Sequence, residues 1–421
     1  MPNIFNTLTI ISSIMESVLA LYFFWLLLCD IIGLFCKKRQ FSEAEPYNFA
    51  VVICARNEEK VIGNLLDSLN KQNYPEDKRK IFVVAHNCTD NTAAVAENHG
   101  ATVLLRNEPS ESFKGQALHF GIDYIKKNYP DCFEAFCVFD ADNVAGLDFL
   151  KEINAALHSG ADVVQGFRNS KNYYASTVSE MFGAYWYQIM ICQNLPQTAM
   201  KLPATMSGTG FAVLADSLPD GWDTLTMLED IEFTCQMAIA GKRCILAPYA
   251  MFYDEQPVSF KIAMRQRYRW AVGGYQVLKI YLPKLLKAIP KQGAKAVKMI
   301  VDILINPVLL ISLLGFFMQI IIAGIKGGAD AGAFGALKDI AAVIFGSAGA
   351  VWLSVLPTTF ILFIKQRMNP FKNFRTVLLF PFFLLISMVF AIPALLDRNP
   401  KWKPIPHTDT KTIDMLESNP D

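Results

Sequence analysis

The sequence is poor in charge, in histidine and in paired cysteines. Only 18% of its 421 residues are charged, below the roughly 25% that is usual for soluble domains. The 39 Lys and Arg almost balance the 38 Asp and Glu, which argues against a nucleic-acid-binding surface. Five dispersed histidines make a histidine-rich metal site unexpected. Nine cysteines without a CxxC pair are typical of reduced core residues and exclude an obvious disulfide framework.

Long hydrophobic runs account for much of the missing charge. Four runs cover residues 17–36, 303–325, 340–364 and 376–396. Each is long enough for a helix to cross a hydrocarbon core about 30 Å thick. Buried core helices are the alternative interpretation, and four such runs in one chain make it the weaker one.

Basic residues predict how the chain is oriented. A cluster at residues 37–39 follows the first run, and positive clusters favour the cytoplasmic side. We therefore expect a multi-pass protein of the plasma membrane with its soluble part in the cytoplasm. The first run is too long and too aromatic for a cleaved signal sequence, so an anchor is expected. Counting spans places the C-terminus outside, whereas basic residues beyond the last run place it inside, and both remain open.

Composition divides the chain into five parts. Residues 1–40 form the expected anchor, and residues 41–256 have ordinary soluble composition. Residues 257–298 contain ten Lys and Arg and no Asp or Glu, which is typical of amphipathic helices on an anionic membrane face; a solvated basic face is the alternative. Residues 299–397 hold three expected transmembrane helices, and residues 398–421 form a tail.

The soluble part alternates between two hydrophobic periodicities. Short β-branched runs at residues 48–55, 81–86, 101–105 and 135–139 predict strands. Helical spacing lies between them, most clearly at residues 115–127. This alternation predicts an α/β fold with a doubly wound sheet. Ligands of such sheets bind beyond the carboxyl ends of the strands, where several polar motifs of this chain fall.

An Asp-x-Asp pair follows the fourth predicted strand. Asp140 and Asp142 are two residues apart, so in an extended segment their side chains point to the same side. Both carboxylates could then face one hard divalent cation, Mg²⁺ or Mn²⁺. A solvated turn is the alternative for this short motif.

Three further motifs are candidates for a site. Glu229 and Asp230 lie in the mostly apolar segment TLTMLEDIEF, where a carboxylate with little solvent could act as a general base; a charge pair at a helix N-terminus is the alternative. Residues 266–270, QRYRW, offer two guanidinium groups for phosphate and an indole for a sugar face, or else a membrane-surface stripe. Gly208 and Gly210 allow a close backbone approach to a ligand or form a tight turn.

The order of these motifs resembles that of the membrane-integrated processive members of glycosyltransferase family 2. These are the cellulose, chitin, poly-N-acetylglucosamine and hyaluronan synthases. The resemblance covers about residues 48–280 by motif and the remainder by hydropathy. It implies a cytoplasmic GT-A (Rossmann-like) domain inserted between transmembrane α-helices.

The resemblance also implies a role for each motif. Asp142 would be the more direct metal ligand beside Asp140, and Asp230 would be the catalytic base next to Glu229. Trp270, Gly208 and Gly210 would contact the acceptor. The residues expected to bind the nucleotide sugar are Asn57, Glu58, Asp90, Lys114, Asp140, Gln266, Arg267 and Arg269. Two departures from the family pattern are Cys54 in place of proline and His86 in place of an acidic residue.

The implied activity is an inverting transfer from a UDP-sugar. The first choice is polymerisation of UDP-glucose into a β-glucan that crosses the bilayer through the spans. The alternatives are a poly-N-acetylglucosamine or chitin type of synthase that uses UDP-N-acetylglucosamine, a non-processive enzyme that glycosylates a membrane lipid, and a nucleotide-binding scaffold or transporter. A cyclic-dinucleotide-binding domain is not expected, because about 25 residues follow the last run.

Overall fold

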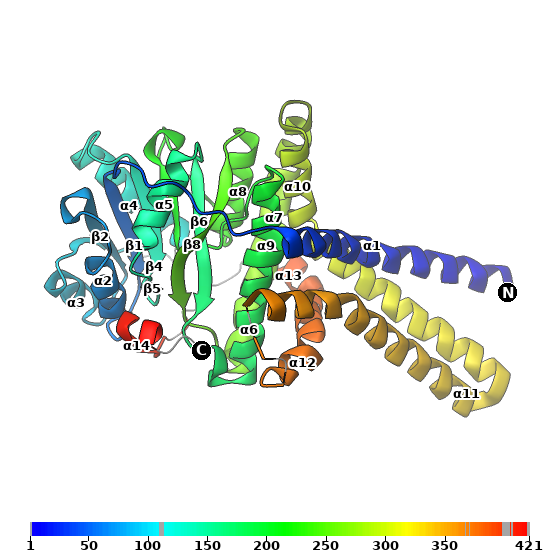
Figure 1. Ribbon diagram of the computed structural model, residues 1–421. Coiled ribbons are helices and arrows are strands. Elements are labelled where there is room, and N and C mark those ends of the chain that lie inside the picture. Colours follow the sequence, from blue (N-terminus) through cyan, green and yellow to red (C-terminus); the bar gives the residue numbers. More distant parts are fainter. Residues whose placement is uncertain are drawn as a thin grey trace.

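The structure has an α/β domain from which an arm of long helices projects. It is a computed structural model, and Figure 1 shows both parts. The N-terminus lies at the far end of the arm, whereas the last helix lies against the α/β domain. The residues that the structure describes are 2–108, 113–366, 368–369, 371–397, 405 and 407–418.

One mixed sheet of eight strands forms the α/β domain, in the order β3-β2-β1-β4-β7-β6-β8-β5. The first four of these strands are parallel, whereas β7 runs antiparallel to both β4 and β6. The strands are β1 (Phe49–Ala55), β2 (Arg79–His86), β3 (Thr102–Arg106), β4 (Ala135–Asp140), β5 (Val144–Ala145), β6 (Val163–Ser170), β7 (Phe211–Leu214) and β8 (Cys244–Asp254). The four predicted strands differ from β1 to β4 by two residues or fewer at each end.

Helices cover both faces of this sheet. The helices α2 (Ile62–Asn70), α3 (Thr92–Asn98) and α5 (Phe149–His158) pack on one face. The helices α4 (Lys114–Asn128) and α8 (Glu229–Ile239) pack on the other. Alternate side chains of β1 enter the two cores, which is why this strand is a continuous hydrophobic run in the sequence. The predicted α/β fold is confirmed.

The basic segment forms two helices beside the α/β domain. Helix α9 (Phe260–Gln292) is capped by Ser259, whose hydroxyl accepts a hydrogen bond from the backbone N–H of Ile262 at 3.3 Å. Helix α10 (Ala294–Ile303) follows after Gly293, which has a φ of 54°. The shorter elements are η1 (Glu76–Lys78), η2 (Tyr173–Ala175), α6 (Thr177–Tyr187), the π-helical η3 (Gln188–Asn194), α7 (Leu195–Ala199) and η4 (Ala215–Ser217).

The arm consists of α1 (Pro2–Phe35) and α11 (Ile305–Gln366). The second and third hydrophobic runs are two legs of α11, which leaves helical geometry only at Ala331 and Gly332. The legs pack so closely near this bend that a Cβ on Gly327 would collide with the Gly335 carbonyl. Among the described residues, three helices are long and apolar enough to cross a membrane, and the two in the arm are 31 and 62 residues long by that measure.

The fourth hydrophobic run is a broken helix that stays close to the α/β domain. It comprises α12 (Phe374–Leu385), η5 (Ile386–Phe390) and α13 (Ala391–Leu396), and its 23 residues are the third candidate span. The hydroxyl of Thr376, near its start, lies 3.5 Å from that of Tyr173. Asp397, directly after its end, accepts a hydrogen bond from the Tyr268 hydroxyl of α9 at 2.6 Å.

The tail returns to the α/β domain. Its helix α14 (Ile413–Ser418) lies next to α2, and Asp414 forms an ion pair of 2.6 Å with Lys71. The described part of the tail therefore lies against the α/β domain, away from the far end of the arm.

Candidate active site

One cavity of about 730 Å³ opens at the carboxyl ends of the parallel strands. Asp142, Asp230 and Trp270, which come from three distant parts of the chain, all line it. The predicted site residues in its wall are Glu58, Lys114, Asp140, Asp142, Gly208, Glu229, Asp230, Gln266, Arg267, Arg269 and Trp270.

Two predicted nucleotide-binding residues hold loops behind this wall instead of lining it. Asn57 has a positive φ of 61°, and its side-chain oxygen accepts a hydrogen bond from the Thr89 N–H at 2.7 Å. Asp90 accepts hydrogen bonds from the backbone N–H groups of Glu59, at 3.2 Å, and of Thr92, at 3.0 Å. These bonds fix the two turns that follow β1 and β2.

The two predicted glycines have different surroundings. Gly208 lines the cavity with a φ of 81°, and a Cβ there would lie 3.3 Å from the Asp230 carboxylate. Gly210, with a φ of 60°, faces the ring of Phe252, which a Cβ would overlap. Gly208 therefore admits a close approach to the site, whereas Gly210 serves packing within the sheet.

The Asp-x-Asp pair lies at the end of β4. The N–H of Asp140 donates a hydrogen bond to the Thr209 hydroxyl at 2.8 Å. Asp142 is only 5% exposed, and this burial, opposed by His407, raises the pKa of its carboxyl to about 7. Asp254 raises it further. Because burial and neighbouring carboxylates destabilise the ionised form of Asp142, a nearby cation would stabilise it.

A buried ion pair supports this acidic end of the site, and sequence reasoning missed it. The Nε of Arg168, on β6, donates to Asp254, at the end of β8, at a distance of 3.0 Å. The Arg168 guanidinium also lies over the Trp186 ring, 3.6 Å from its centroid, and the Asn143 amide donates to Asp254 at 2.9 Å. Asp254 is the last residue of β8, whereas Arg168 lies two residues before the end of β6, and neither strand was among those predicted from the sequence.

Lys114 connects the acidic pair to the candidate base. Its ammonium group forms an ion pair with Asp140, lies 3.8 Å from Glu229, and donates to the Gly208 carbonyl at 2.7 Å. Burial, with a contribution from Asp230, raises the pKa of Glu229 to about 7, and burial also raises the pKa of Asp230. A carboxylate with a raised pKa at the start of α8 has the properties of a general base near neutral pH.

The two arginines of the QRYRW motif both line the cavity but have different partners. Arg267 is 3% exposed, its guanidinium lies 3.9 Å from the centroid of Phe383, and it donates to the Ser387 hydroxyl at 3.0 Å. Burial lowers the pKa of Arg267 to about 10. Arg269 instead donates to the Met227 carbonyl at 3.3 Å and lowers the pKa of Glu229 and of Asp230. Arg269 is thus the guanidinium of this motif that acts on the carboxylates.

Trp270 belongs to an aromatic cluster in the cavity wall. Its ring stacks on Tyr185 with centroids 5.9 Å apart and meets Trp186 edge-on at 5.8 Å. The side-chain oxygen of Gln266, one turn away, is buried and has no hydrogen-bond partner among the described residues. A ligand in the cavity could satisfy this oxygen.

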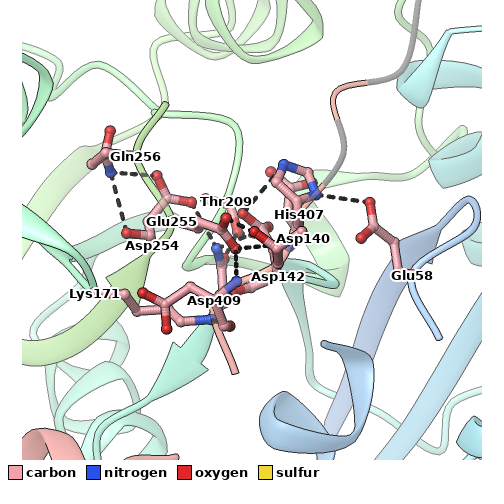
Figure 2. A network of polar contacts seen from close by, with 12 residues as sticks. Glu58, Asp140, Asp142, Lys171, Thr209, Asp254, Glu255, Gln256, His407 and Asp409 are labelled. Atoms are coloured by element: carbon pink, nitrogen blue, oxygen red, sulfur yellow. Dashed lines mark hydrogen bonds and ion pairs between the residues drawn. The ribbon is translucent and has the colours of Figure 1, made fainter. Parts of the chain in front are cut away.

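A residue of the tail also lies in the site. Figure 2 shows His407 between Glu58 and the Asp-x-Asp pair. Its Nδ1 lies 2.9 Å from a Glu58 oxygen, and its Nε2 lies 3.6 Å from Asp142. The tail has no strand or helix pattern around this position, so the sequence offered no signal for it.

The residues at the acidic end suit a hard divalent cation. Asp142 and Asp140 offer carboxylate oxygens, which are preferred by Mg²⁺ and Mn²⁺. In the part of the chain that the structure describes, no three His, Cys, Asp or Glu side chains are arranged as a ready metal cage. A cation at Asp142 would therefore take further ligands from a bound phosphate group and from water.

The cavity extends from these polar groups toward the helical arm. Four residues of α1, at positions that share one helical face, line its far end. They are Leu19, Tyr22, Phe23 and Leu26. Leu309, in the first turns of α11, lies in the same wall. The α1 side of this end is mainly apolar, whereas Asp302 and Asn306, shortly before Leu309 in the chain, add polar groups to the wall.

Comparisons with known proteins give relatives for the α/β domain. The chain is 25% identical over 260 residues to a probable glycosyltransferase, YdaM, of Bacillus subtilis, covering 56% of this chain and 58% of the relative. It is 26% identical over 254 residues to a beta-monoglucosyldiacylglycerol synthase of Nostoc sp., covering 56% and 51%. It is 25% identical over 248 residues to a poly-beta-1,6-N-acetyl-D-glucosamine synthase of Staphylococcus aureus, covering 58% of each. The match therefore spans little more than half of these curated relatives.

A solved structure and a family profile complete the comparison. The mannosyltransferase PcManGT of Pyrobaculum calidifontis, in complex with GDP-Man and Mn²⁺, matches with a TM-score of 0.60 at 18% identity, over 92% of this chain and 100% of that one. The predicted GT-A fold is thereby confirmed. A profile described as "Glycosyltransferase like family 2" matches residues 46–273, and the chain belongs to this family.

Proposed function

We propose that the protein is an inverting, metal-dependent glycosyltransferase that moves a hexosyl group from a UDP-sugar to an acceptor at the membrane. The shared cavity carries this proposal, because Asp142, Lys114, Asp230 and Trp270 line one space that continues to α1. Orientation of the α/β domain toward the cytoplasm of a plasma membrane is part of the proposal, and the basic α9 and the apolar arm support it.

The chemistry needs one base and several cations. The Asp230 carboxylate takes the proton of the acceptor hydroxyl while the hydroxyl oxygen bonds to the anomeric carbon. The bond between that carbon and the diphosphate oxygen breaks, and UDP leaves from the opposite face. Lys114 and Arg269 offset negative charge around the reacting groups. A Mg²⁺ or Mn²⁺ ion at Asp142 would supply the remaining positive charge for the diphosphate.

An acceptor with a lipid tail fits the far end of the cavity best. A polysaccharide carries many hydroxyl groups, and each would need a polar partner in a buried channel. The face of α1 that lines the cavity offers three aliphatic or phenyl side chains and one tyrosine. These suit an acyl chain, and the glucolipid synthase among the relatives is in accord with this choice.

Polymer synthesis is the second candidate. The aromatic cluster of Trp270, Tyr185 and Trp186 beside Asp230 favours it, because aromatic rings stack on sugar faces. UDP-glucose remains the first choice of donor and UDP-N-acetylglucosamine the second, as for the poly-N-acetylglucosamine synthase among the relatives.

One product assay tests both candidates. The purified protein in lipid nanodiscs is incubated with Mn²⁺ and radiolabelled UDP-glucose, UDP-N-acetylglucosamine or GDP-mannose. A label that enters the organic phase supports the lipid acceptor, whereas a high-mass, water-soluble or insoluble glycan supports the polymer. Absence of transfer from every donor, with intact protein, would contradict the proposed function. The Asp230→Asn variant is the control for non-enzymatic label transfer.

A further inference from the structure

The C-terminal tail brings a histidine into the donor end of the cavity. His407 lies 265 positions beyond Asp142 in the chain, yet the imidazole Nε2 and the Asp142 carboxylate are 3.6 Å apart. His407 and Asp142 both line the cavity. Nothing in the family motifs of residues 48–280 required a contribution from this part of the chain.

Several bonds hold the tail at this position. The backbone N–H groups of Thr408 and Asp409 donate to the Glu255 carboxylate at 3.0 and 2.9 Å. The Lys171 ammonium group donates to the Asp409 carbonyl at 2.8 Å, and Lys411 donates to the Lys171 carbonyl at 2.7 Å. Glu255 directly follows β8, so these bonds fasten the tail to the sheet edge that carries the site (Figure 2).

The partners of the imidazole determine which nitrogen can bind a cation. Nδ1 lies 2.9 Å from a Glu58 oxygen. An ionised carboxylate can only accept a hydrogen bond, so Nδ1 carries the proton and donates. Against the effect of burial, Asp142 and Glu58 raise the pKa of His407 to about 10, so Nε2 also carries a proton when no cation is bound. A cation between Nε2 and Asp142 would take the place of that proton. A carboxylate that orients a histidine from behind while the other nitrogen faces a metal is a recurrent arrangement in metalloproteins.

The distance between Nε2 and Asp142 suits a shared ion. At 3.6 Å the two atoms are too far apart for a hydrogen bond. Two ligands at about 2.1 Å from one divalent ion lie roughly 3–4 Å apart, depending on the angle between them. The spacing is therefore compatible with one cation that contacts both atoms.

We propose that His407 is a ligand of the divalent cation, so that the C-terminal tail completes the donor site together with Asp142. This inference rests on the metal-dependent function proposed above. An imidazole ligand binds Mn²⁺ more readily than Mg²⁺, so the site should prefer Mn²⁺. The tail is then a structural part of the active site, and donor binding depends on residues outside the α/β domain.

The test uses the Mn²⁺ ion itself as the probe. The full-length protein in detergent, in a buffer without imidazole, is titrated with Mn²⁺ alone and with Mn²⁺ plus UDP, and binding is followed by electron paramagnetic resonance. Pulsed measurements then detect nitrogen nuclei bound to Mn²⁺. We expect a histidine nitrogen signal in the native protein that is lost in His407→Ala, with a Mn²⁺ dissociation constant about 10- to 100-fold higher.

Two variants serve as controls. Thr408→Ala removes an exposed side chain and keeps the backbone N–H that binds Glu255, so it should retain both the nitrogen signal and the affinity. Asp142→Asn should weaken Mn²⁺ binding whether or not His407 is a ligand. The nitrogen signal of the native protein needs no substitution, so a folding defect in a variant cannot produce it.

The outcomes separate this inference from the function on which it rests. Mn²⁺ that binds through Asp142 without a histidine nitrogen would overturn the role of His407 and leave the proposed function intact. Tighter Mn²⁺ binding by His407→Ala would also overturn it, because the tail would then compete with the cation for Asp142. A native protein that binds no Mn²⁺, with or without UDP, would overturn both the ligand role and the metal-dependent function.

Discussion

The ammonium group of Lys114 lies 3.8 Å from the carboxylate of Glu229, across the boundary between the donor end of the cavity and the base. Lys114 is the first residue of α4, and Glu229 is the first residue of α8. The same ammonium group is paired with Asp140. One cation thus links the Asp-x-Asp pair to the Glu-Asp pair, and its removal should raise the pKa of Glu229 and of Asp230.

Replacement of Lys114 by methionine should shift the pH dependence of the reaction. The pKa of Glu229 is about 7, and Lys114 lowers it against the effects of burial and Asp230. In Lys114→Met the pKa of Glu229 rises, so this carboxylate is protonated at higher pH than in the native protein. Activity that needs it ionised is lost as pH falls, and this acidic limb should move to higher pH.

The measurement is kcat/KM between about pH 5.5 and 9. Lys127→Met is the matched control, because Lys127 lies on the same helix, is 71% exposed and pairs only with Asp123 among its described ion pairs. An acidic limb that stays in place in Lys114→Met would show that Glu229 ionisation does not control the rate.

Replacement of Asp230 by asparagine should separate binding from catalysis. The amide keeps the size of the side chain but cannot take a proton at neutral pH. We expect kcat to fall by about 10²- to 10⁴-fold, while UDP affinity changes by less than about twofold. Calorimetry with UDP and Mn²⁺ gives the affinity, and label transfer gives kcat. Asp216→Asn, at an exposed position, is the control, and sugar transfer at the native rate by Asp230→Asn would remove Asp230 from this role.

The parts of the fold and of the site that depend on local patterns could be predicted from the sequence. The buried strand that ends at Asp140 and the helix that begins at Lys114 have clear periodicity, so their ends and the polar residues there could be predicted. The antiparallel placement of β7 between β4 and β6 could not, because strand direction depends on long-range pairing. Arg267 could not be placed either, since its guanidinium packs on Phe383, more than 100 positions away.

Loss of the Arg168 side chain should destabilise the α/β domain. Arg168 and Asp254 are 7% and 3% exposed, so Arg168→Met leaves a buried carboxylate without its partner. Such a change typically costs about 3–5 kcal/mol, which corresponds to a decrease in Tm of roughly 6–20 °C for a domain of this size. Fluorescence-detected thermal unfolding in detergent measures it.

A second substitution tests the cause of that loss. In Arg168→Met with Asp254→Asn, no unpaired buried charge remains, so part of the lost stability should return. If the double variant is as unstable as the sum of the two single variants, the loss comes from packing on Trp186 and from the Ser207 carbonyl, to which Arg168 donates at 2.7 Å.

The two ends of the chain should lie on opposite sides of the membrane. The tail contacts the α/β domain through Lys71 and Asp414, and α12 to α13 returns to that domain at both ends. Only α1 and the two legs of α11 would then cross. A fluorescent protein fused after residue 421 should be bright in cells, whereas alkaline phosphatase fused at the bend near Gly332 should be active outside. Active phosphatase at the C-terminus would show that the last run crosses as well.

A bulky side chain on the cavity-facing side of α1 should slow transfer to a lipid acceptor without slowing hydrolysis of the donor, in which water is the acceptor. Leu19 lines the apolar end of the cavity, and tryptophan there overfills a packed space at a cost of about 1–3 kcal/mol. If an acyl chain occupies this end, Leu19→Trp should lower kcat/KM for the lipid acceptor by roughly 5- to 150-fold. The rate of UDP release by hydrolysis of the donor should not change, because hydrolysis needs only the donor end of the cavity.

Leu21→Trp is the matched control, because Leu21 is 69% exposed on α1 and absent from the cavity wall. Equal transfer rates in the two variants would mean that the acceptor reaches Asp230 by another path, and a polymer would then become the favoured product.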